Sequence, residues 1–312
     1  MVKIQELMKY DTGGDPIKGI KWMRTTPGKV ASYLRHSLGI NISRTTVRKF
    51  LRGMGYSLKC NRKVLVPKSA PERDQQFYII RDKREEFEAE GEPIISVDTK
   101  KRELVGLFKN PGRIWTKKAV NVYEHDFRSQ AEGVAIPYGV YDVQANHGFV
   151  FVGTTHDTPE FAVSSIAKWW RYQGRRQYPN ARELLILADA GGSNGPRGAW
   201  KRALQEKLSD RYGLTIVVSH YPSGTSKWNP IEHRLFSEIT KNWTGCPLDS
   251  YETVLNYIGT TTTNGGLKVK SYLDWKRYET GTQIPSEILK HLSIEPDENL
   301  AKWNYTIQPR EM

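Results

Sequence analysis

Apolar positions between residues 28 and 54 recur every three or four residues, which is the spacing of the buried face of a helix. A first stripe consists of Val30, Leu34 and Leu38. A second stripe consists of Val47, Phe50, Leu51 and Met54. Gly39 breaks the pattern between them, and Ser43 is a favourable N-cap for the second stripe. We therefore predict a helix over 28–38 and a second one from Ser43 to Met54, joined by a tight turn.

Further along the chain the pattern changes twice. Residues 71–90 combine charges of both signs with a sparse apolar stripe of Phe77, Ile80 and Phe87, which predicts a connecting helix with a solvated face. From Pro93 onward, short continuous apolar runs are typical of buried strands. The predicted strands cover residues 94–98, 135–143, 148–153, 183–188 and 214–219. The predicted helices cover residues 158–172, 197–212 and 230–243.

The order of these elements from residue 93 is strand, strand, strand, helix, strand, helix, strand, helix. This order predicts an α/β fold, namely a ribonuclease-H-like mixed sheet flanked by helices, over residues 93–312. A small basic helix-turn-helix domain precedes it over residues 1–66, and the segment after Gly55 can add a wing to that domain. Residues 67–92 are expected to link the two domains.

Charge is distributed unevenly along the 312 residues. The chain has 47 Lys and Arg against 34 Asp and Glu, and residues 1–70 alone carry fifteen basic and three acidic side chains. Such a concentration is typical of a nucleic-acid-binding module, although charge alone fits a solvated basic arm equally well.

The second predicted helix favours DNA binding over the solvated arm. Its polar face carries Thr45, Arg48, Lys49 and Arg52. A basic outer face opposite an apolar stripe is expected of a recognition helix that enters a major groove. Arg62 and Lys63 follow in the segment that can form a wing against phosphates. The alternative is a purely structural helical hairpin.

Three acidic residues stand where a sheet of this kind places a site. Asp98 ends the first predicted strand and Asp189 follows the fourth. Sites in open α/β sheets gather at the carboxyl ends of the strands. Glu232 lies in the first turn of the helix that Pro230 begins, and we expect it to face the same edge. Taken singly, each acid also fits a turn, cap or helix-dipole role, so only their joint placement favours a site.

Three carboxylates that converge repel one another strongly unless a cation lies between them. Oxygen ligands without closely spaced histidines favour Mg²⁺ or Mn²⁺, and two such ions suit in-line displacement at phosphorus. Cys60 and Cys246 are far apart in the sequence, which excludes a disulfide framework and a Cys-type zinc site. No apolar run is long enough to span a membrane, so we expect a cytoplasmic, nucleoid-associated protein without membrane contact.

Four long segments carry a family resemblance. They are SVDTKKRELVGLFKNPGR at 96–113, AIPYGVYD at 135–142, LILADAGGSNG at 185–195 and HYPSGTSKWNPIEHRLFS at 220–237. In this order they resemble the ISAzo-type insertion-sequence transposases, whose catalytic part is the Rhodopirellula-type transposase DDE domain. The likeness extends from Pro16 to Pro309, and the WNPIEH segment also resembles the glutamate motif of mariner-type transposases.

The resemblance implies a catalytic, metal-binding DDE triad that maps onto Asp98, Asp189 and Glu232. It implies Mg²⁺-dependent cleavage at the ends of a mobile element and strand transfer into target DNA, carried out by a homo-oligomer in a synaptic complex. Candidate site-wall or DNA-contacting residues in the same motifs are Lys100, Lys101, Asn194, His220, Lys227, Trp228, Asn229 and His233. Trp228 fits stacking on an unpaired base or a place in the core, and Lys227 fits a phosphate contact or plain solvation.

One segment without an assigned role and two departures from the family leave alternatives open. Residues 105–130 have no ribonuclease-H counterpart, and their basic side chains fit either a DNA backbone or a solvated hairpin. Ala190 replaces a usual glycine, which is tolerated if this residue avoids positive φ. The family's usual upstream DNA-binding region is absent from this sequence, which favours a catalytically silent or truncated remnant that binds element ends without cutting them. A nuclease without strand transfer is the third possibility.

Overall fold

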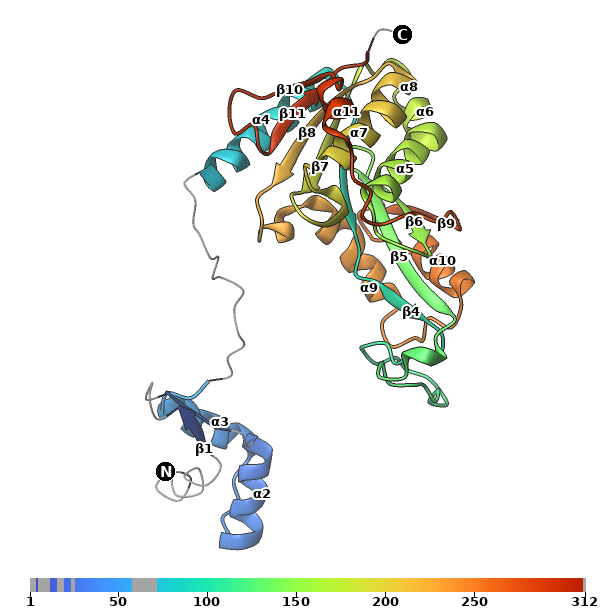
Figure 1. Ribbon diagram of the computed structural model, residues 1–312. Helices are drawn as coiled ribbons and strands as arrows, with labels where there is room; N and C mark the ends of the chain where they lie inside the picture. Colours follow the sequence, from blue (N-terminus) through green and yellow to red (C-terminus); the bar gives the residue numbers. More distant parts are fainter. Residues whose placement is uncertain (1–3, 5–11, 16–19, 24–25, 58–71, 311–312) are drawn as a thin grey trace. The chain divides into compact units, whose positions relative to one another are not determined.

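The computed structural model describes residues 4, 12–15, 20–23, 26–57 and 72–310 (Figure 1). By its internal contacts the chain separates into two compact units, Met1–Pro67 and Lys68–Met312. Within the described residues, no helix combines the length and the apolar character that crossing a membrane requires.

The first unit contains the two helices that the sequence predicts. They are α2 (Pro27–Leu38) and α3 (Arg44–Gly53). Ser43 caps α3 by accepting a hydrogen bond from the Thr46 amide at 3.1 Å, and Gly39 ends α2 in the left-handed conformation. Their shared core consists of Ile4, Val30, Ala31, Leu34, Val47 and Leu51. A hairpin that the pattern did not predict, β1 (Thr12–Asp15) with β2 (Ile20–Met23), precedes them.

The second unit is built on one mixed sheet (Figure 1). Its central strands are β3 (Ile94–Thr99), β5 (Gly133–Asp142), β6 (His147–Gly153), β7 (Glu183–Asp189) and β8 (Thr215–Tyr221). They lie in the order β6-β5-β3-β7-β8, with β5 antiparallel to its neighbours and β7 and β8 parallel to β3. This arrangement confirms the predicted ribonuclease-H-like mixed sheet.

Helices cover both faces of this sheet (Figure 1). On one face, α5 (Pro159–Trp169), a π-helical turn (Trp170–Gly174), α6 (Arg175–Gln177), α7 (Gly198–Leu204), a second π-helical turn (Gln205–Ser209) and α8 (Asp210–Tyr212) enclose the largest apolar cluster. On the other face, the segment from the π-helical turn Glu232–Phe236 through α9 (Ser237–Asn242) packs with α10 (Tyr251–Gly259). The three predicted helices are therefore confirmed, each with one wider turn.

Helix α4 (Glu72–Glu90) belongs to the second unit rather than to a solvated connection. Its Ile80 and Phe87 pack on the sheet, in a cluster with Leu185 and Leu187 of β7. The buried Gln76 side chain donates a hydrogen bond to the His220 carbonyl at 3.0 Å. The predicted helix and its apolar stripe are confirmed, and its role as the link between the two domains stays a prediction.

Several elements carry too little periodicity to be predicted. They are β4 (Glu103–Val105), β9 (Lys268–Asp274), α11 (Ser286–Lys290), β10 (Ile294–Pro296) and β11 (Asn304–Ile307), with short 3-10 turns at Arg128–Gln130, Gly192–Asn194 and Ser226–Trp228. β9 extends the sheet in parallel beside β6, and β11 pairs antiparallel with β8.

Candidate active site

Two of the predicted acids stand beside each other at one edge of the sheet. Asp98 lies near the carboxyl end of β3, and Asp189 is the last residue of β7. These strands are parallel neighbours in which Val97 pairs with Ala188, so the next position on each strand carries an acid. The carboxyl ends of β3 and β7 therefore bring Asp98 and Asp189 together.

The electrostatics place Glu232 in the same group. Burial, followed by the charge of Asp189, raises the pKa of Asp98 to about 8, and Glu232 adds to this effect. Burial and Glu232 also raise the pKa of Asp189 to about 6, against a lowering hydrogen bond from Asn229. The pKa of Glu232 is itself raised by burial, while Lys100 and His233 oppose that rise. Glu232 thus makes both aspartates harder to ionise, and Asp189 has the same effect on Asp98.

Amide donors hold the two aspartates separately. The Asp98 Oδ1 accepts hydrogen bonds from the Thr99 amide at 2.7 Å and from the Asn194 side chain at 3.2 Å. The Asp189 Oδ1 accepts one from the Asn229 side chain at 3.2 Å. Across residues 72–310 and the shorter described segments, no three Asp, Glu, His or Cys side chains gather closely enough to hold a metal ion. The three acids therefore lie close enough to influence pKa values within the group, but their side chains do not form a complete set of metal ligands.

Asn229 connects the three elements that carry the acids. It is buried, its amide also donates to the Val97 carbonyl of β3 at 3.2 Å, and its oxygen accepts from the Ser96 hydroxyl. Ser96 in turn accepts a hydrogen bond from the Ile231 amide at 3.0 Å, next to Glu232. This Ser96–Asn229 clip fixes the start of the Glu232 helix against β3 and β7.

Glycines allow the same helix to approach the sheet closely. A Cβ at Gly139 of β5 would come within 2.6 Å of Phe236, and a Cβ at Gly148 of β6 would come within 2.5 Å of Leu235. Real Cβ atoms do not tolerate such distances, so larger residues here would displace the π-helical turn that contains Glu232.

A fourth carboxylate, Asp157, lies at this edge and is not among the predicted site residues. It accepts a hydrogen bond from the Thr99 hydroxyl at 3.0 Å, and its charge adds to the raised pKa of Asp98. Asp157 directly precedes Thr158, the N-cap of α5, and follows β6, which runs parallel to β3. The strand-end rule that selected Asp98 could therefore have selected Asp157.

Two of the predicted wall residues do line the acidic site. Asn194 is buried between Asp98 and the Tyr138 hydroxyl, which donates to it at 2.8 Å. Lys100 is buried with its Nζ 4.5 Å from the Trp243 ring centroid and 3.4 Å from Glu103. Burial lowers the pKa of Lys100, whereas Glu103 and Glu232 raise it, so this cation partly offsets the acidic charge.

His220 does not contact the open site, and its predicted place in the site wall is wrong. The side chain is fully buried, which lowers its pKa to about 4. Its Nδ1–H donates to the Asp189 carbonyl at 3.2 Å, and its Nε2 accepts from the Tyr305 hydroxyl at 3.0 Å. The hydroxyl accepts in turn from the Trp200 indole at 2.9 Å. His220 therefore supports the backbone beneath Asp189.

Lys227, Trp228 and His233 lie on the exposed loop and turn beside Glu232. Trp228 is 59% exposed, with its ring edge-on to Phe77 at 6.0 Å, so the core alternative for this tryptophan is wrong. The His233 ring is hydrogen bonded to the Lys227 carbonyl, which ties the two ends of the segment 227–233 together. The phosphate contact expected of Lys227 stays a prediction.

The predicted DNA-reading face of α3 is exposed, whereas Val47 and Leu51 are buried. The exposed face consists of Thr45, Arg48, Lys49 and Arg52. Arg62 and Lys63, the predicted wing residues, lie outside the described residues.

Residues 106–127 form an exposed excursion between β4 and β5. Phe108 and Tyr123 make an isolated bridge, and Lys109 pairs with Glu124 at 2.8 Å. That ion pair lies on the surface of the protein. The DNA contact predicted for the basic residues of 105–130, which are Lys109, Arg113, Lys117, Lys118 and Arg128, stays a prediction.

The chain is similar to solved structures of Mos1 transposase complexes. A mariner Mos1 paired-end complex with Mg is 16% identical with a TM-score of 0.44, and a Mos1 strand transfer complex is 17% identical with a TM-score of 0.43. In both cases the match covers 82% of this chain and 68% of that chain. No curated protein matches.

A family model settles the affiliation of the chain. The model described as the Rhodopirellula transposase DDE domain matches residues 3–309, which is nearly the whole sequence. Ala190, where a glycine is usual, is not among the described residues with positive φ, so the alanine is tolerated as predicted. The match spans the α2–α3 unit, the strands that carry Asp98 and Asp189, and the turn that carries Glu232, and the chain belongs to this family of DDE transposases.

Proposed function

We propose that this protein cleaves DNA at the ends of an insertion sequence and joins the released ends to target DNA. The observation that carries the proposal is the adjacency of Asp98 and Asp189 at the carboxyl ends of parallel strands, with the charge of Glu232 acting on both. The membership of the chain in a DDE transposase family supports the same chemistry.

The donor set fits Mg²⁺ or Mn²⁺. Asp98, Asp189 and Glu232 supply hard oxygen ligands. Besides burial, the charge of Glu232 raises the pKa of both aspartates, a repulsion that a divalent cation would relieve. These three side chains would hold the metal, the two aspartates after turning away from their present amide donors. When bound, one or two such ions activate the attacking hydroxyl or water and stabilise the leaving oxygen.

Other residues of the chain serve orientation and charge balance in this proposal. Asn194 and Asn229 fix the aspartate carboxylates until they turn, and the Ser96–Asn229 clip sets the position of Glu232. The buried Lys100 keeps a positive charge near Glu232, which favours its ionised form.

The proposal is tested with linear DNA that carries the inverted repeats flanking the gene. Incubation with Mg²⁺ should give products in which the cleaved ends are joined to a target plasmid, and a chelator should abolish them. Nicks without joined products would indicate a nuclease. Salt-dependent binding to the repeats without any cleavage would indicate a silent remnant and would contradict the proposal.

We expect cation binding and cleavage to strengthen as the pH rises from 6 to 8.5. A protonated carboxyl cannot ligate a cation, and the pKa values of Asp189 and Asp98 are raised to about 6 and about 8. Below pH 8 the apparent Mn²⁺ affinity, measured by titration calorimetry, should fall by about tenfold per pH unit or more steeply. An affinity that is constant across this range would show that Asp98 is not a ligand.

We expect α3 to supply phosphate and base contacts. Replacing both Arg48 and Lys49 with Gln should weaken binding to the terminal repeats and reduce the slope of log affinity against log salt by about 2. The matched control is the double replacement of Lys29 and Arg35, exposed residues on α2, because it removes the same charge. Equal losses in both double variants would mean that only net charge matters.

A further inference from the structure

The segment that follows β9 is tied to the edge of the sheet that carries the acids. Residues 274–278, which we call the β9 strap, end in the buried Tyr278. The Tyr278 amide donates to the Thr155 hydroxyl at 3.3 Å, and the Tyr278 carbonyl is hydrogen bonded to the His156 ring at 3.1 Å. The Tyr278 hydroxyl donates to the buried Asp274 carboxylate at 2.8 Å. The strap is therefore fixed at both ends, on β9 and on the residues that follow β6.

The middle of the strap is exposed and basic. It consists of Trp275, Lys276 and Arg277. The acid within the strap, Asp274, is already paired with Lys168 at 2.6 Å. The Lys276 Nζ lies 5.1 Å from the Tyr278 ring centroid, a contact that orients the ammonium group without neutralising it. Two adjacent positive charges therefore stand on a backbone that is fixed at both ends.

The strap stands beside the acids, three strands away from Asp98. In the register of the sheet, Asp98 is level with Gly139 of β5, which is level with Val150 of β6. Val150 is in turn level with Ser271 of β9. Since β3, β6 and β9 run in the same direction, Asp274 lies three residues beyond the level of Asp98. Strand spacings of about 4.8 Å and a rise of about 3.3 Å per residue place the strap roughly 17 Å from Asp98.

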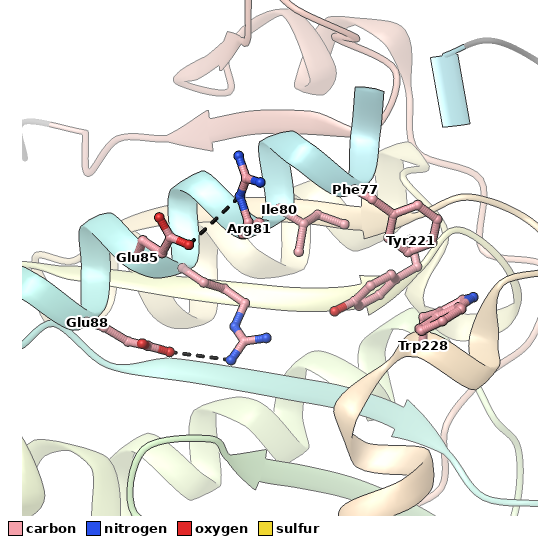
Figure 2. A pocket seen from close by; sticks show the side chains of 8 residues that line it. Phe77, Ile80, Arg81, Glu85, Glu88, Tyr221 and Trp228 are labelled. Carbon is pink, nitrogen blue, oxygen red and sulfur yellow. Dashed lines mark hydrogen bonds and ion pairs between the residues drawn. The ribbon is translucent and has the colours of Figure 1, made fainter. Parts of the chain in front are cut away.

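The cations on the β8 side of the acids are neutralised by their neighbours. In the pocket that α4 forms with Tyr221, Arg81 pairs with Glu85 at 3.8 Å (Figure 2). In the same wall Arg84 pairs with Glu88 at 3.4 Å. These two pairs leave a phosphate little surplus positive charge on that side. The strap, in contrast, offers its cations to a polyanion that lies along the edge of the sheet.

We propose that the β9 strap binds the sugar–phosphate backbone of the element-end duplex whose scissile strand lies at the acids. The inference rests on the proposed function for its DNA substrate. Lys276 and Arg277 each neutralise one phosphate, which favours the entry of DNA beside carboxylates that repel it. Because one strand advances 3.4 Å per base pair, a separation of roughly 17 Å places these phosphates about five base pairs from the cut.

The test measures how full-length protein binds terminal-repeat DNA without divalent cation, so that no strand is cut. Neutral methylphosphonates replace single phosphates about four to six base pairs from the cut. At the contacted positions they should weaken binding by the parent protein about two- to fivefold, the effect of one exposed ion pair. The strap variant, with Lys276→Gln and Arg277→Gln, should be insensitive to them. Between about 50 and 200 mM salt it should also lose about tenfold less affinity than the parent.

The matched control combines Lys268→Gln with Lys270→Gln. Both lysines are exposed, and they lie at the start of β9, the end of the strand that points away from the acids. This variant removes the same charge and should keep the parent's sensitivity to methylphosphonates. Glu279→Gln gives the converse test, because loss of the exposed acid that follows the strap should strengthen binding. All of these side chains are exposed, so the melting temperatures should stay close to that of the parent protein.

The outcomes separate this inference from the proposed function. Equal sensitivity of the parent and the strap variant at every modified phosphate, with normal cleavage in Mg²⁺, would overturn the strap and leave the proposed function standing. A strap-dependent loss of joining that appears only with methylphosphonates in the target duplex would assign the strap to target DNA and also overturn the inference. A difference at the predicted phosphates in a parent protein that never cleaves would contradict the proposed function and leave the contact with the element end standing.

Discussion

Asp98→Asn is expected to abolish DNA cleavage and, in the absence of divalent cations, to make the protein more stable. The cleavage rate should fall by at least about 10³-fold, since a lost metal ligand removes several kcal/mol of charge stabilisation from the transition state. Binding to the terminal repeats should be unchanged, because α3 belongs to the other compact unit. Gel analysis of cleavage and of repeat binding measures both effects.

The gain in stability follows from the raised pKa of Asp98. Its pKa in the folded protein is about 8 against 3.8 ordinarily, so its favourable contribution is complete below pH 3.8 and is lost as the pH rises toward 8. Asparagine cannot ionise, so the variant does not lose this contribution at pH 8. We expect the variant to melt about 2–8 °C higher at pH 8 and equally near pH 4. Adding Mn²⁺ should stabilise only the parent protein, and a variant that melts lower at pH 8 would contradict the electrostatic account.

Asn229→Ala is expected to slow cleavage by about 10²-fold, because small misplacements of catalytic groups have effects of that size. The variant loses the hydrogen bonds to Asp189 and Val97 and leaves the Ser96 hydroxyl with one partner fewer. Asn229 acts through these acids, so we regard it as a positioning residue. The rate constant for cleavage should fall while the affinity for DNA stays constant, and the affinity for Mn²⁺ should fall with the rate.

The matched control is Asn304→Ala. Asn304 is also fully buried and hydrogen bonded, to Gln76 of α4, but it contacts none of the three acids. Both variants should lose comparable thermal stability. If Asn304→Ala slows cleavage as much as Asn229→Ala at a temperature where both are folded, the effect of Asn229 is only on stability.

The spacing of apolar residues along the sequence predicted those helices and strands whose burial depends on that spacing. The stripes of α2 and α3 identified these helices, because burial of one helix face fixes the spacing of apolar residues. The apolar runs of β3, β7 and β8 identified these strands, because both faces of each strand are buried. From strand ends alone, Asp98 and Asp189 were placed together, and the register of β3 with β7 confirms this. The family predicted from four motifs is confirmed as well.

Contacts between distant polar residues could not be predicted in this way. The role of Asn229 depends on Ser96, 133 positions away in the sequence, and no spacing rule connects them. His220 looked like a site residue because of its motif, yet it serves buried backbone. Strand β9 was missed because Lys268 and Lys270 are exposed and Val269 alone is buried at its start, so its apolar content is low.

The wider coil at Glu232–Phe236 contains one residue more than an α-helical turn. Because the wide turn absorbs this residue, deleting one residue from it would leave the flanking turns nearly in register. Deleting one residue from α9 would instead rotate Glu232 by about 100° relative to the end of the helix. Under the proposed function, loss of three nucleotides within the α9 codons would thus immobilise a copy of the element without interrupting its reading frame.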